Sequence, residues 1–502
     1  MIKKSKILIT ILALTVLLGS CGKETIVSDE TETQGDSPLV SQNEVEQAEQ
    51  PETEKSDERI MPNIPESADF AGEEIRFMHW ALFEGTVYYN RDIYSDVLTG
   101  EAINDTVFTR NVKIEDSYNV KITLDMTPYA NIDSAVGQAV STGDTTYRAV
   151  YPLLCVSGGM YTKGYFHNLY DVTNLDLSKP WYDQKCVNSL SIGGILPLVS
   201  TAININDKDS TSCLLFNKQL AADTGIEDLY EITRNGKLTI DKVAEISEIA
   251  TFDANGDGVM DKNDIFGYIS GRDTIDNFYH GSDSLMVQKE DGKYIFTYGT
   301  EHDIDVTQKA INFMSENFFL NRHLTDIGGD EGMRVMYRAG QGMFLEGRLG
   351  EITNFRDSDI DFGVLPIPKY DESQKEYASP VSQYTTGFMS VPITLDGDRL
   401  TVTGTVLEAL AAESYYTLIP EYVESSIKIK NARDTESGEM IEIILSNRVF
   451  DPMSVYDFGG FSNAFLLFSD EGSTDIASFV QKHKTEVDTS VNTIVQELLP
   501  NK

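Results

Sequence analysis

The sequence predicts an α/β protein with two lobes, and two observations lead to this fold class. Over residues 74–154, stretches with the period of a strand alternate with stretches with the period of a helix, as in a parallel α/β sheet. The chain also has 502 residues, more than one hydrophobic core usually serves, and 41% of them are hydrophobic, which is enough to fill two cores.

The individual elements follow from the spacing of apolar residues. Residues 74–80 form an apolar run that predicts a buried first strand, and the apolar residues of 102–118 fall on one face of a helix. Residues 120–126 alternate between apolar and polar, which predicts a strand with one face in water. A further strand is expected over residues 147–154, and the apolar spacing of residues 475–498 predicts a closing helix.

Residues 1–20 have the organisation of an export signal peptide. A cluster of lysines precedes an apolar run over residues 7–18, which is too short to span a bilayer. The Leu-Gly-Ser-Cys sequence that follows resembles a bacterial lipobox, so Cys21 is expected to carry palmitate or a similar lipid at the mature N-terminus. The alternative is an ordinary secretory signal with a chance cysteine.

Residues 21–65 are expected to form a disordered acidic linker. Between residues 23 and 58 the chain is rich in Glu, Thr, Ser and Gln and has too few apolar side chains to bury a core. Repulsion between its carboxylates should extend this segment. The linker would keep a globular body on the extracytoplasmic face of the cell membrane while letting it turn toward a partner.

The chain is strongly acidic, with 80 Asp and Glu residues against 40 Lys and Arg residues and a net charge of −40. This charge argues against nucleic acid as a partner and against adsorption to anionic lipid head groups. A neutral or cationic ligand suits it better.

The cysteines do not form a disulfide scaffold, because 4 are too few for a chain of this length. With Cys21 assigned to lipidation, Cys155, Cys186 and Cys213 are left. They allow either one disulfide or three buried thiols, and the sequence does not decide between these alternatives.

Residues 253–264 have the pattern of a twelve-residue EF-hand calcium loop, with Gly258 at the sixth position, where the chain turns sharply. The expected oxygen donors are the side chains of Asp253, Asn255, Asp257, Asp261 and Asp264 and the backbone carbonyl of Val259. Because the last donor is an aspartate instead of the longer glutamate, and no second loop is visible, we expect one structural Ca²⁺ of modest affinity. The alternative is a surface turn rich in Asn, Asp and Gly.

A series of short motifs follows in order along the chain. They are Asn-Asp-Thr at 104–106, Arg-Asn at 110–111, Tyr-Asn-Val at 118–120, Lys-Pro-Trp at 179–181, Phe-Asn-Lys at 216–218, Gly-Lys-Leu-Thr at 236–239, Gly-Met-Phe at 342–344, Phe-Gly-Val-Leu-Pro-Ile-Pro-Lys at 362–369 and Lys-Asn-Ala-Arg-Asp at 430–434. In order and spacing they resemble the extracellular solute-binding lipoproteins of sugar-type ABC importers, the bacterial family 1-like substrate-binding proteins. The resemblance covers most of residues 70–460 and includes a calcium loop in the second lobe.

This resemblance implies a two-lobed periplasmic-binding-protein-like (Venus-flytrap) α/β fold with a ligand cleft between the lobes. Lobe 1 would begin with residues 66–210, and lobe 2 would occupy residues 211–365. Residues 366–502 would return, complete lobe 1 and add C-terminal helices. The crossings near residues 203–211 and 365–370 are the expected hinges.

The resemblance also implies a monomeric receptor that is not an enzyme. It would capture a solute, an oligosaccharide or glycoside, and deliver it to the permease subunits of an ABC transporter. The sequence has no pattern of a serine hydrolase, a zinc protease or a phosphate-binding loop, and its 6 histidines are scattered. The alternative is a lipid-anchored surface enzyme acting on carbohydrates, or an interaction protein.

The candidate ligand residues are aromatic or polar side chains, because sugars stack their C–H faces on rings and pair their hydroxyls with charged or amide groups. They are Trp80, Trp181, Glu346, Arg348 and Tyr384. Trp80 follows the first strand, whose carboxyl end would open into the cleft. The alternative is core packing for the two tryptophans and a solvated rim pair for Glu346 and Arg348.

Overall fold

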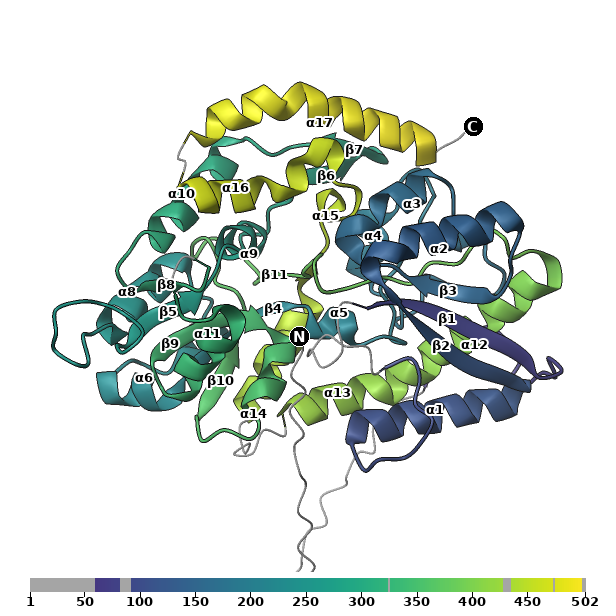
Figure 1. Cartoon of the computed structure of the whole chain (residues 1–502), viewed down its shortest axis with the longest axis horizontal. Coiled ribbons are helices and arrows are strands. Elements are labelled where there is room, and N and C mark those ends of the chain that lie inside the picture. Colours follow the sequence, from purple (N-terminus) through teal and green to yellow (C-terminus); the bar gives the residue numbers. More distant parts are fainter. Residues whose placement is uncertain (1–58, 82–91, 324–325, 428–434, 473–474, 499–502) are drawn as a thin grey trace, which may run out of the picture. The chain divides into compact units, whose positions relative to one another are not determined.

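Two separate β-sheets, one of three strands and one of five, form the framework of the protein (Figure 1). The computed structural model describes residues 59–81, 92–323, 326–427, 435–472 and 475–498. By its contacts, the chain from Ile60 onward forms one unit. The predicted signal peptide, the predicted lipid site at Cys21 and most of the predicted linker lie outside the described residues.

The three-stranded sheet is parallel and has the strand order β2-β1-β3. Its elements are β1 (Glu73–Ala81), α1 (Ala102–Tyr118), β2 (Val120–Pro128), α2 (Tyr129–Thr142) and β3 (Tyr147–Tyr151). The alternation of strand and helix is required because parallel neighbours cannot be joined by a tight hairpin. The predicted elements are confirmed, except that β3 ends at Tyr151, before Pro152, which has no N–H to donate.

The five-stranded sheet is mixed and has the order β10-β4-β9-β5-β8. Its strands are β4 (Ser212–Asn217), β5 (Phe266–Ser270), β8 (Phe319–Asn321), β9 (Gly342–Arg348) and β10 (Phe362–Leu365). Strand β4 is antiparallel to β9 and β10, whereas β5 is parallel to β8 and β9. The carboxyl ends of β5, β8 and β9 therefore lie along the same edge of this sheet.

Polar side chains fix where several helices around the five-stranded sheet begin. Asn217, Asp228 and Thr239 each accept a backbone N–H of the first helical turn, and Thr300 and Asp303 form a capping box. The helices are α6 (Lys218–Thr224), α7 (Leu229–Arg234), α8 (Ile240–Ala250), α9 (Thr274–Gly281), α10 (Glu301–Met314) and α11 (Gly329–Arg338). Each start is thus encoded locally, whereas the place of the helix in the fold depends on packing.

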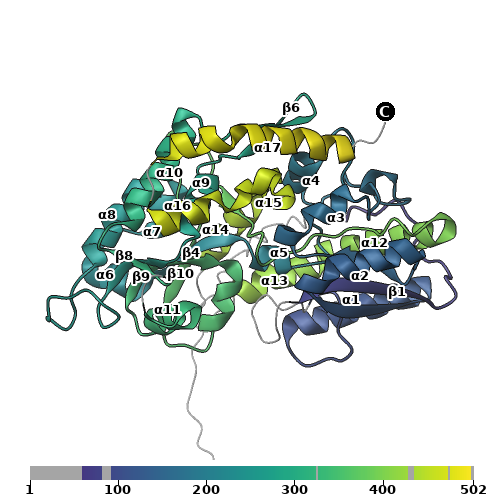
Figure 2. The same ribbon diagram turned by 45° about the horizontal axis from the view of Figure 1, so that its top comes forward.

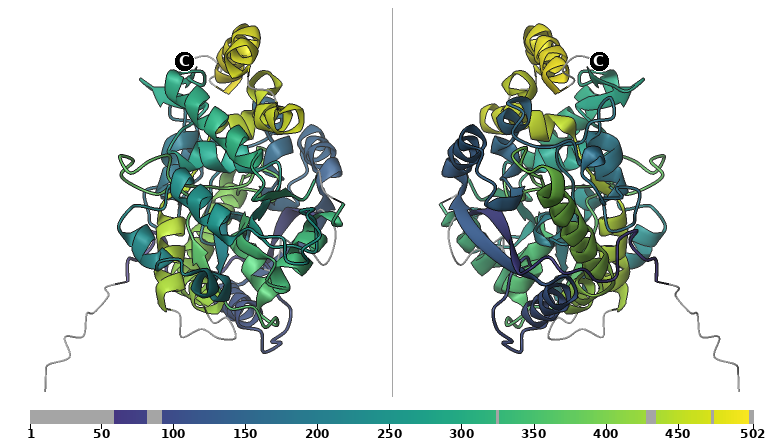
Figure 3. Two further views of the ribbon diagram at one scale, coloured as in Figure 1. Left: turned by 90° about the vertical axis from the view of Figure 1, so that its left-hand side faces the viewer. Right: turned by 90° about the vertical axis from the view of Figure 1, so that its right-hand side faces the viewer.

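The remaining elements pack around the two sheets. They are α3 (Gly158–Thr162), α4 (Gln184–Leu190), α5 (Asn206–Asp209), β6 (Val287–Glu290), β7 (Lys293–Phe296), η3 (Leu349–Phe355), β11 (Ser379–Pro380), α12 (Gly397–Tyr416), α13 (Leu418–Ile427), α14 (Thr435–Ser446), β12 (Arg448–Val449), α15 (Pro452–Tyr456), η4 (Phe458–Asn463), α16 (Ala464–Glu471) and α17 (Ile476–Leu498). Helix α12 packs on α1 beside the three-stranded sheet (Figure 3).

Helix α17 confirms the predicted closing helix and contacts both halves of the fold. It packs on β7 and α10 and also on α3, so it extends across the top of the molecule in Figures 1 and 2. Its buried positions include Val480, Val487 and Val491, which lie on one face of the helix. None of the helices within the described ranges is long and apolar enough to cross a membrane.

After β10 the chain returns to the three-stranded sheet. Met389 forms an antiparallel bridge with Val199, and Ser390 forms one with Val150 of β3. The return depends on Gly387, because a Cβ there would lie 2.5 Å from the carbonyl oxygen of Pro152 and 2.9 Å from the ring of Trp80. The domain boundaries expected from the sequence stay a prediction.

The described cysteines Cys155, Cys186 and Cys213 are free thiols, which decides against the disulfide alternative. Cys186 and Cys213 are fully buried, whereas Cys155 is only partly buried. Burial raises the pKa of all three thiols, so they are protonated at neutral pH.

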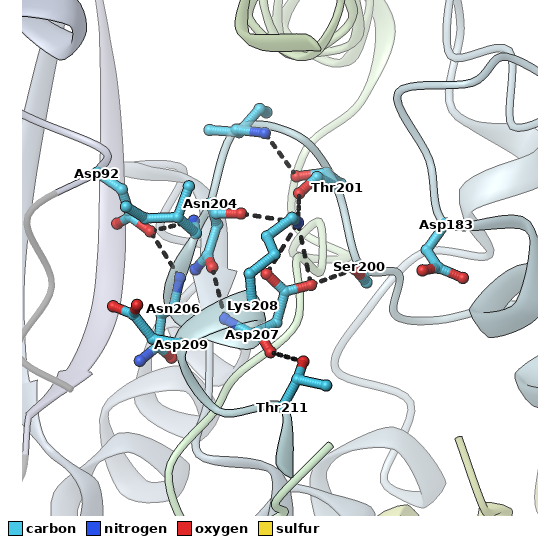
Figure 4. A network of polar contacts seen from close by, with 12 residues as sticks. Asp92, Asp183, Ser200, Thr201, Asn204, Asn206, Asp207, Lys208, Asp209 and Thr211 are labelled. Carbon is cyan, nitrogen blue, oxygen red and sulfur yellow. Dashed lines mark hydrogen bonds and ion pairs between the residues drawn. The ribbon is translucent and has the colours of Figure 1, made fainter. Parts of the chain in front are cut away.

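A buried ionic network, which we call the crossing network, holds the segment between α4 and β4, and Figure 4 shows the part of it around Asp207 and Lys208. Asp207 accepts hydrogen bonds from Lys208 Nζ at 2.9 Å, from Arg448 Nη1 at 2.8 Å and from the hydroxyl of Ser200. Arg448 also donates to the carboxylate of Asp183, which caps the N-terminus of α4. The network therefore joins α4, the crossing segment and β12 through one arginine.

The charges in the crossing network compensate one another inside the protein. Asp207, Lys208 and Arg448 are all buried. Burial alone would raise the pKa of Asp207, but Lys208 and Arg448 outweigh it and leave that pKa lowered, so Asp207 is ionised at neutral pH. The Nζ of Lys208 also donates to the carbonyl oxygens of Thr201 at 2.9 Å and Asn204 at 3.0 Å, which fixes the course of the backbone.

Replacing Arg448 with Met should lower the free energy of unfolding by about 3–5 kcal/mol, because Asp183 and Asp207 would lose their shared arginine inside the protein. Urea unfolding measures this change. The control is Lys163→Met, which breaks an exposed ion pair with Asp133 and should leave the unfolding midpoint almost unchanged. Equal midpoints for the two variants would show that the network does not hold the fold.

Candidate ligand-binding site

A small cavity, which we call the cleft cavity, lies where the five-stranded sheet, the return segment and the C-terminal helices meet. It is lined by Ser212 of β4, Arg348 of β9, Asp273, Asp276 and Asn277 at α9, Pro380, Ser382, Gln383 and Tyr384 of the return segment, and Ser462, Phe465 and Leu466 of η4 and α16. A second cavity shares Asp276, Pro380 and Gln383 with it and continues toward Phe388 and Phe450. The walls thus come from segments far apart in the sequence.

The volume of these cavities limits what they hold in this conformation. Each has about 20 Å³ of free space, which is room for about one water molecule. A monosaccharide is far larger, so a ligand of that kind would need the walls to move apart before it enters.

The charged wall of the cleft cavity is built by the edge at which β5, β8 and β9 end. Asp273 follows β5, Arg322 follows β8, and Arg348 is the last residue of β9. The Oδ2 of Asp273 lies 3.0 Å from Arg322 Nη2 and 3.2 Å from Arg348 Nη2. Burial would raise the pKa of Asp273, but the two arginines outweigh it and the pKa is lowered, so the carboxylate is ionised at neutral pH.

Asp276 and His280 form a second compensated pair on helix α9. His280 Nδ1 lies 3.2 Å from Asp276 Oδ1, and its Nε2 lies 3.2 Å from Asp451 Oδ2. Burial would lower the pKa of His280, but the two carboxylates outweigh it and raise the pKa to about 10. The imidazole is therefore charged at neutral pH, and its stabilising contribution is lost only as the pH rises from about 6.5 through about 10.

Glu346 is buried behind the wall and lines neither cavity. In this structure it therefore forms neither a solvated rim pair with Arg348 nor part of the cavity surface that a ligand would contact. Its buried carboxylate accepts from Tyr268 at 2.6 Å, from Ser270 at 2.9 Å and from Asn277 Nδ2 at 2.8 Å. The amide oxygen of Asn277 accepts in turn from Ser212 at 2.8 Å. Glu346 therefore orients two residues that do line the cavity.

Arg348 and Tyr384 are the two candidate ligand residues that the structure brings together in the cleft cavity. Arg348 approaches from β9, and Tyr384 approaches from the return segment opposite. The hydroxyl of Tyr384 donates to Asn463 Oδ1 at 3.0 Å, which ties this lining residue to η4.

Neither tryptophan lines the two cavities. Trp181 is buried, and its Nε1 donates to Glu408 Oε1 at 3.2 Å. Trp80 is buried at the end of β1, where its ring lies 5.7 Å from that of His79. These positions favour the core-packing alternative for both residues.

Sequence reasoning missed most of the cavity lining, notably Asp273, Asp276 and Asn277. Asp276 and Asn277 lie three and four positions after Asp273, which places both on the same side of a helix as Asp273. That spacing was the available signal. Ser382 and Gln383 precede Tyr384 directly, but nothing in the local pattern distinguishes them from other polar residues.

A larger groove of about 790 Å³ lies between α8 and α10. Its lining comes from helices around the five-stranded sheet and from Tyr370, and it includes the carboxylates of Asp241, Glu245, Glu248, Asp305 and Glu316. The groove receives no residue from the three-stranded sheet, the segment 380–384 or the C-terminal helices. Its size alone does not make it the ligand site of a two-lobed fold.

The predicted calcium loop has a backbone suited to the motif. Gly258 at its sixth position has φ +81°, a left-handed conformation that favours glycine, and a bridge between Phe252 and Ile265 closes the loop. Asp253 accepts from Gly258 N at 2.7 Å, and the buried Asp264 accepts from backbone N–H groups inside the loop. In the described part of the chain no three His, Cys, Asp or Glu side chains converge on one point, so ion binding would require these carboxylates to turn inward.

No protein-family model matches the sequence, and no curated protein matches it. Solved structures match the fold across most of the chain. An ABC substrate-binding protein of Listeria monocytogenes in complex with cycloalternan is 12% identical with a TM-score of 0.52, and the match covers 86% of this chain and 100% of that one. The chain therefore has the α/β fold of the periplasmic binding proteins, as predicted.

Two further structures give the same result. The GacH receptor of Streptomyces glaucescens, solved unliganded and with acarbose, is 12% identical with a TM-score of 0.51 over 86% of this chain and 100% of that one. The cyclic α-maltosyl-1,6-maltose binding protein of Arthrobacter globiformis is 12% identical with a TM-score of 0.53 over 85% and 99%. The proteins in these matches bind their ligands and are not described as enzymes.

Proposed function

We propose that this protein is a receptor that captures a carbohydrate between its two lobes and delivers it to the permease of an ABC importer. The observation that carries the proposal is the match in fold, over most of the chain, to binding proteins, among them one solved with cycloalternan and one solved with acarbose. The cleft cavity supports it, because its walls come from the five-stranded sheet on one side and from the return segment on the other.

The chemistry of the cleft cavity suits a sugar. Ser212, Asn277, Ser382 and Gln383 offer hydroxyl and amide groups, and Tyr384 and Phe465 offer rings, as sugar hydroxyls and C–H faces require. A ligand that touches both walls contacts more protein when they are closed, so it shifts the protein toward the closed state. A shift from 1:99 to 99:1 needs about 5.5 kcal/mol of preference for that state.

A bound oligosaccharide should lower the radius of gyration of the protein. Tyr384→Ala should weaken binding about tenfold, or about 1.4 kcal/mol, because an aromatic ring that lines the cavity is lost. A thermal-shift panel that includes maltotetraose and acarbose finds the ligand, and small-angle scattering with calorimetry measures both effects. Tyr170→Ala, at an exposed ring away from the cavities, is the control. An unchanged radius at saturation, or product formation from the panel, would favour a surface enzyme instead.

We also propose that the protein is anchored by lipid at Cys21 on the extracytoplasmic face of the membrane. The support is the order of lysines, apolar run and lipobox-like sequence. Cys21→Ala should leave the chain unprocessed or release it from membranes, which detergent partitioning and the mass of the mature N-terminus measure. Unchanged partitioning of this variant would refute the anchor.

A structural Ca²⁺ in the loop 253–264 is the third part of the proposal, supported by donor types in register and by the left-handed Gly258. At about 100 times its dissociation constant the ion would stabilise the fold by about 2.7 kcal/mol. Chelation or Asp257→Ala should therefore lower the melting temperature and leave ligand specificity intact. Asp357→Ala, an exposed carboxylate outside the loop, is the control. If chelation left the melting temperature unchanged and elemental analysis found no calcium in the protein, the proposed calcium site would be wrong.

A further inference from the structure

The charges around the cleft cavity suggest which carbohydrates it accepts. We infer that the site selects uncharged sugars and rejects those with a carboxylate, and that Asp273 sets this selectivity. The inference rests on the proposed function and narrows its ligand class.

The first argument is that the charged groups lining the cavity already have opposite partners. The charged side chains of the lining are Asp273, Asp276 and Arg348. Asp273 contacts Arg322 and Arg348 at 3.0 and 3.2 Å, and Asp276 contacts His280 at 3.2 Å. A charged ligand would have to break such a pair to gain one of its own, while losing its hydration.

The second argument is that this compensation does not depend on cleft closure. Asp273, Arg322 and Arg348 all follow or end strands of the five-stranded sheet, and Asp276 and His280 belong to one helix that begins at the same edge. The pairs therefore move as part of one wall. Opening the cleft to admit a ligand would leave Arg348 bound to Asp273.

The third argument concerns the opposite wall, which offers no cation to a ligand carboxylate. Pro380, Ser382, Gln383 and Tyr384 of the return segment and Ser462, Phe465 and Leu466 carry no charged group. A ligand carboxylate would thus be repelled by Asp273 and Asp276, and the arginine of the lining, Arg348, is already paired with Asp273. Asp273 has the decisive position, because it contacts both arginines at the edge.

The test compares one sugar in two charge states. Maltotetraose, cellotetraose and mannotetraose are each titrated calorimetrically beside the same tetrasaccharide with its primary alcohols oxidised to carboxylates. The wild-type protein should bind at least one neutral sugar at least tenfold more tightly than its oxidised form. Asp273→Asn should reduce this preference at least tenfold, because it raises the charge of the wall by one unit.

Two features keep the experiment interpretable. The side chain of Asp273 makes no capping hydrogen bond to α9, so Asp273→Asn should leave the start of that helix intact. Because the change removes the carboxylate that Arg322 and Arg348 share, it should lower the melting temperature, and the titrations are run well below that temperature. The matched control is Asp470→Asn, which makes the same charge change at an exposed carboxylate paired with Arg272 at 2.9 Å, outside the cavity lining. It should alter the preference less than threefold.

Each outcome decides the question. Wild-type binding of an oxidised sugar as tight as that of its neutral form overturns the selectivity and leaves the proposed function standing. Equal effects of Asp273→Asn and Asp470→Asn would assign the selectivity to the overall charge of the chain and overturn the role of Asp273. Binding of none of the six sugars would count against the proposed function and overturn this inference with it.

Discussion

The arrangement of the two sheets depends on the buried ion pairs that Arg448 makes with Asp183 and Asp207. Arg448 contacts Asp183 at the start of α4 and Asp207 in the crossing segment, which are 265 and 241 residues away in the sequence. Uncompensated charges inside a protein cost several kcal/mol, so the three elements are held within hydrogen-bond distance of one another. Strand β4 begins only five residues after Asp207, and the crossing network therefore also fixes where the five-stranded sheet starts.

The edge of that sheet then determines the chemistry of the cleft cavity. Because β5, β8 and β9 are parallel, they deliver Asp273, Arg322 and Arg348 to one place. Glu346 lies two residues before Arg348 on β9 and is buried behind the cavity wall. Its carboxylate accepts from Asn277, which in turn accepts from Ser212, so Glu346 orients both residues. Successive residues of a strand point to opposite faces, but Glu346 and Arg348 are two apart and share a face, so what separates them is depth along the strand.

The sequence was sufficient for features encoded by local spacing and insufficient for those made by distant residues. The periodicity of apolar residues predicted β1, α1, β2 and α17, because each of these elements buries either one face or a continuous apolar stretch. The predicted end of β3 was three residues too late, because Pro152 ends the strand after Tyr151. The ordered motifs led to the correct fold class. Arg348 and Tyr384 line the cleft cavity, and their contact with a ligand stays a prediction. Trp181 could not be distinguished from a ligand residue by sequence, since its partner Glu408 lies 227 residues away. The crossing network was invisible for the same reason.

The asymmetry of the cleft cavity also bears on how it could close. One wall carries Asp273, which is paired at the edge of the five-stranded sheet, and Asp276, which is paired with His280 on α9; His280 also pairs with Asp451 at the start of α15. The other wall, formed by residues 380–384 and 462–466, presents hydroxyl, amide and aromatic groups. Bringing the walls together therefore desolvates no isolated charge, which would otherwise oppose closure strongly. The free energy of closure can then be set by the contacts that a ligand makes with both walls, which is the condition under which ligand binding controls the state of a two-state clamp.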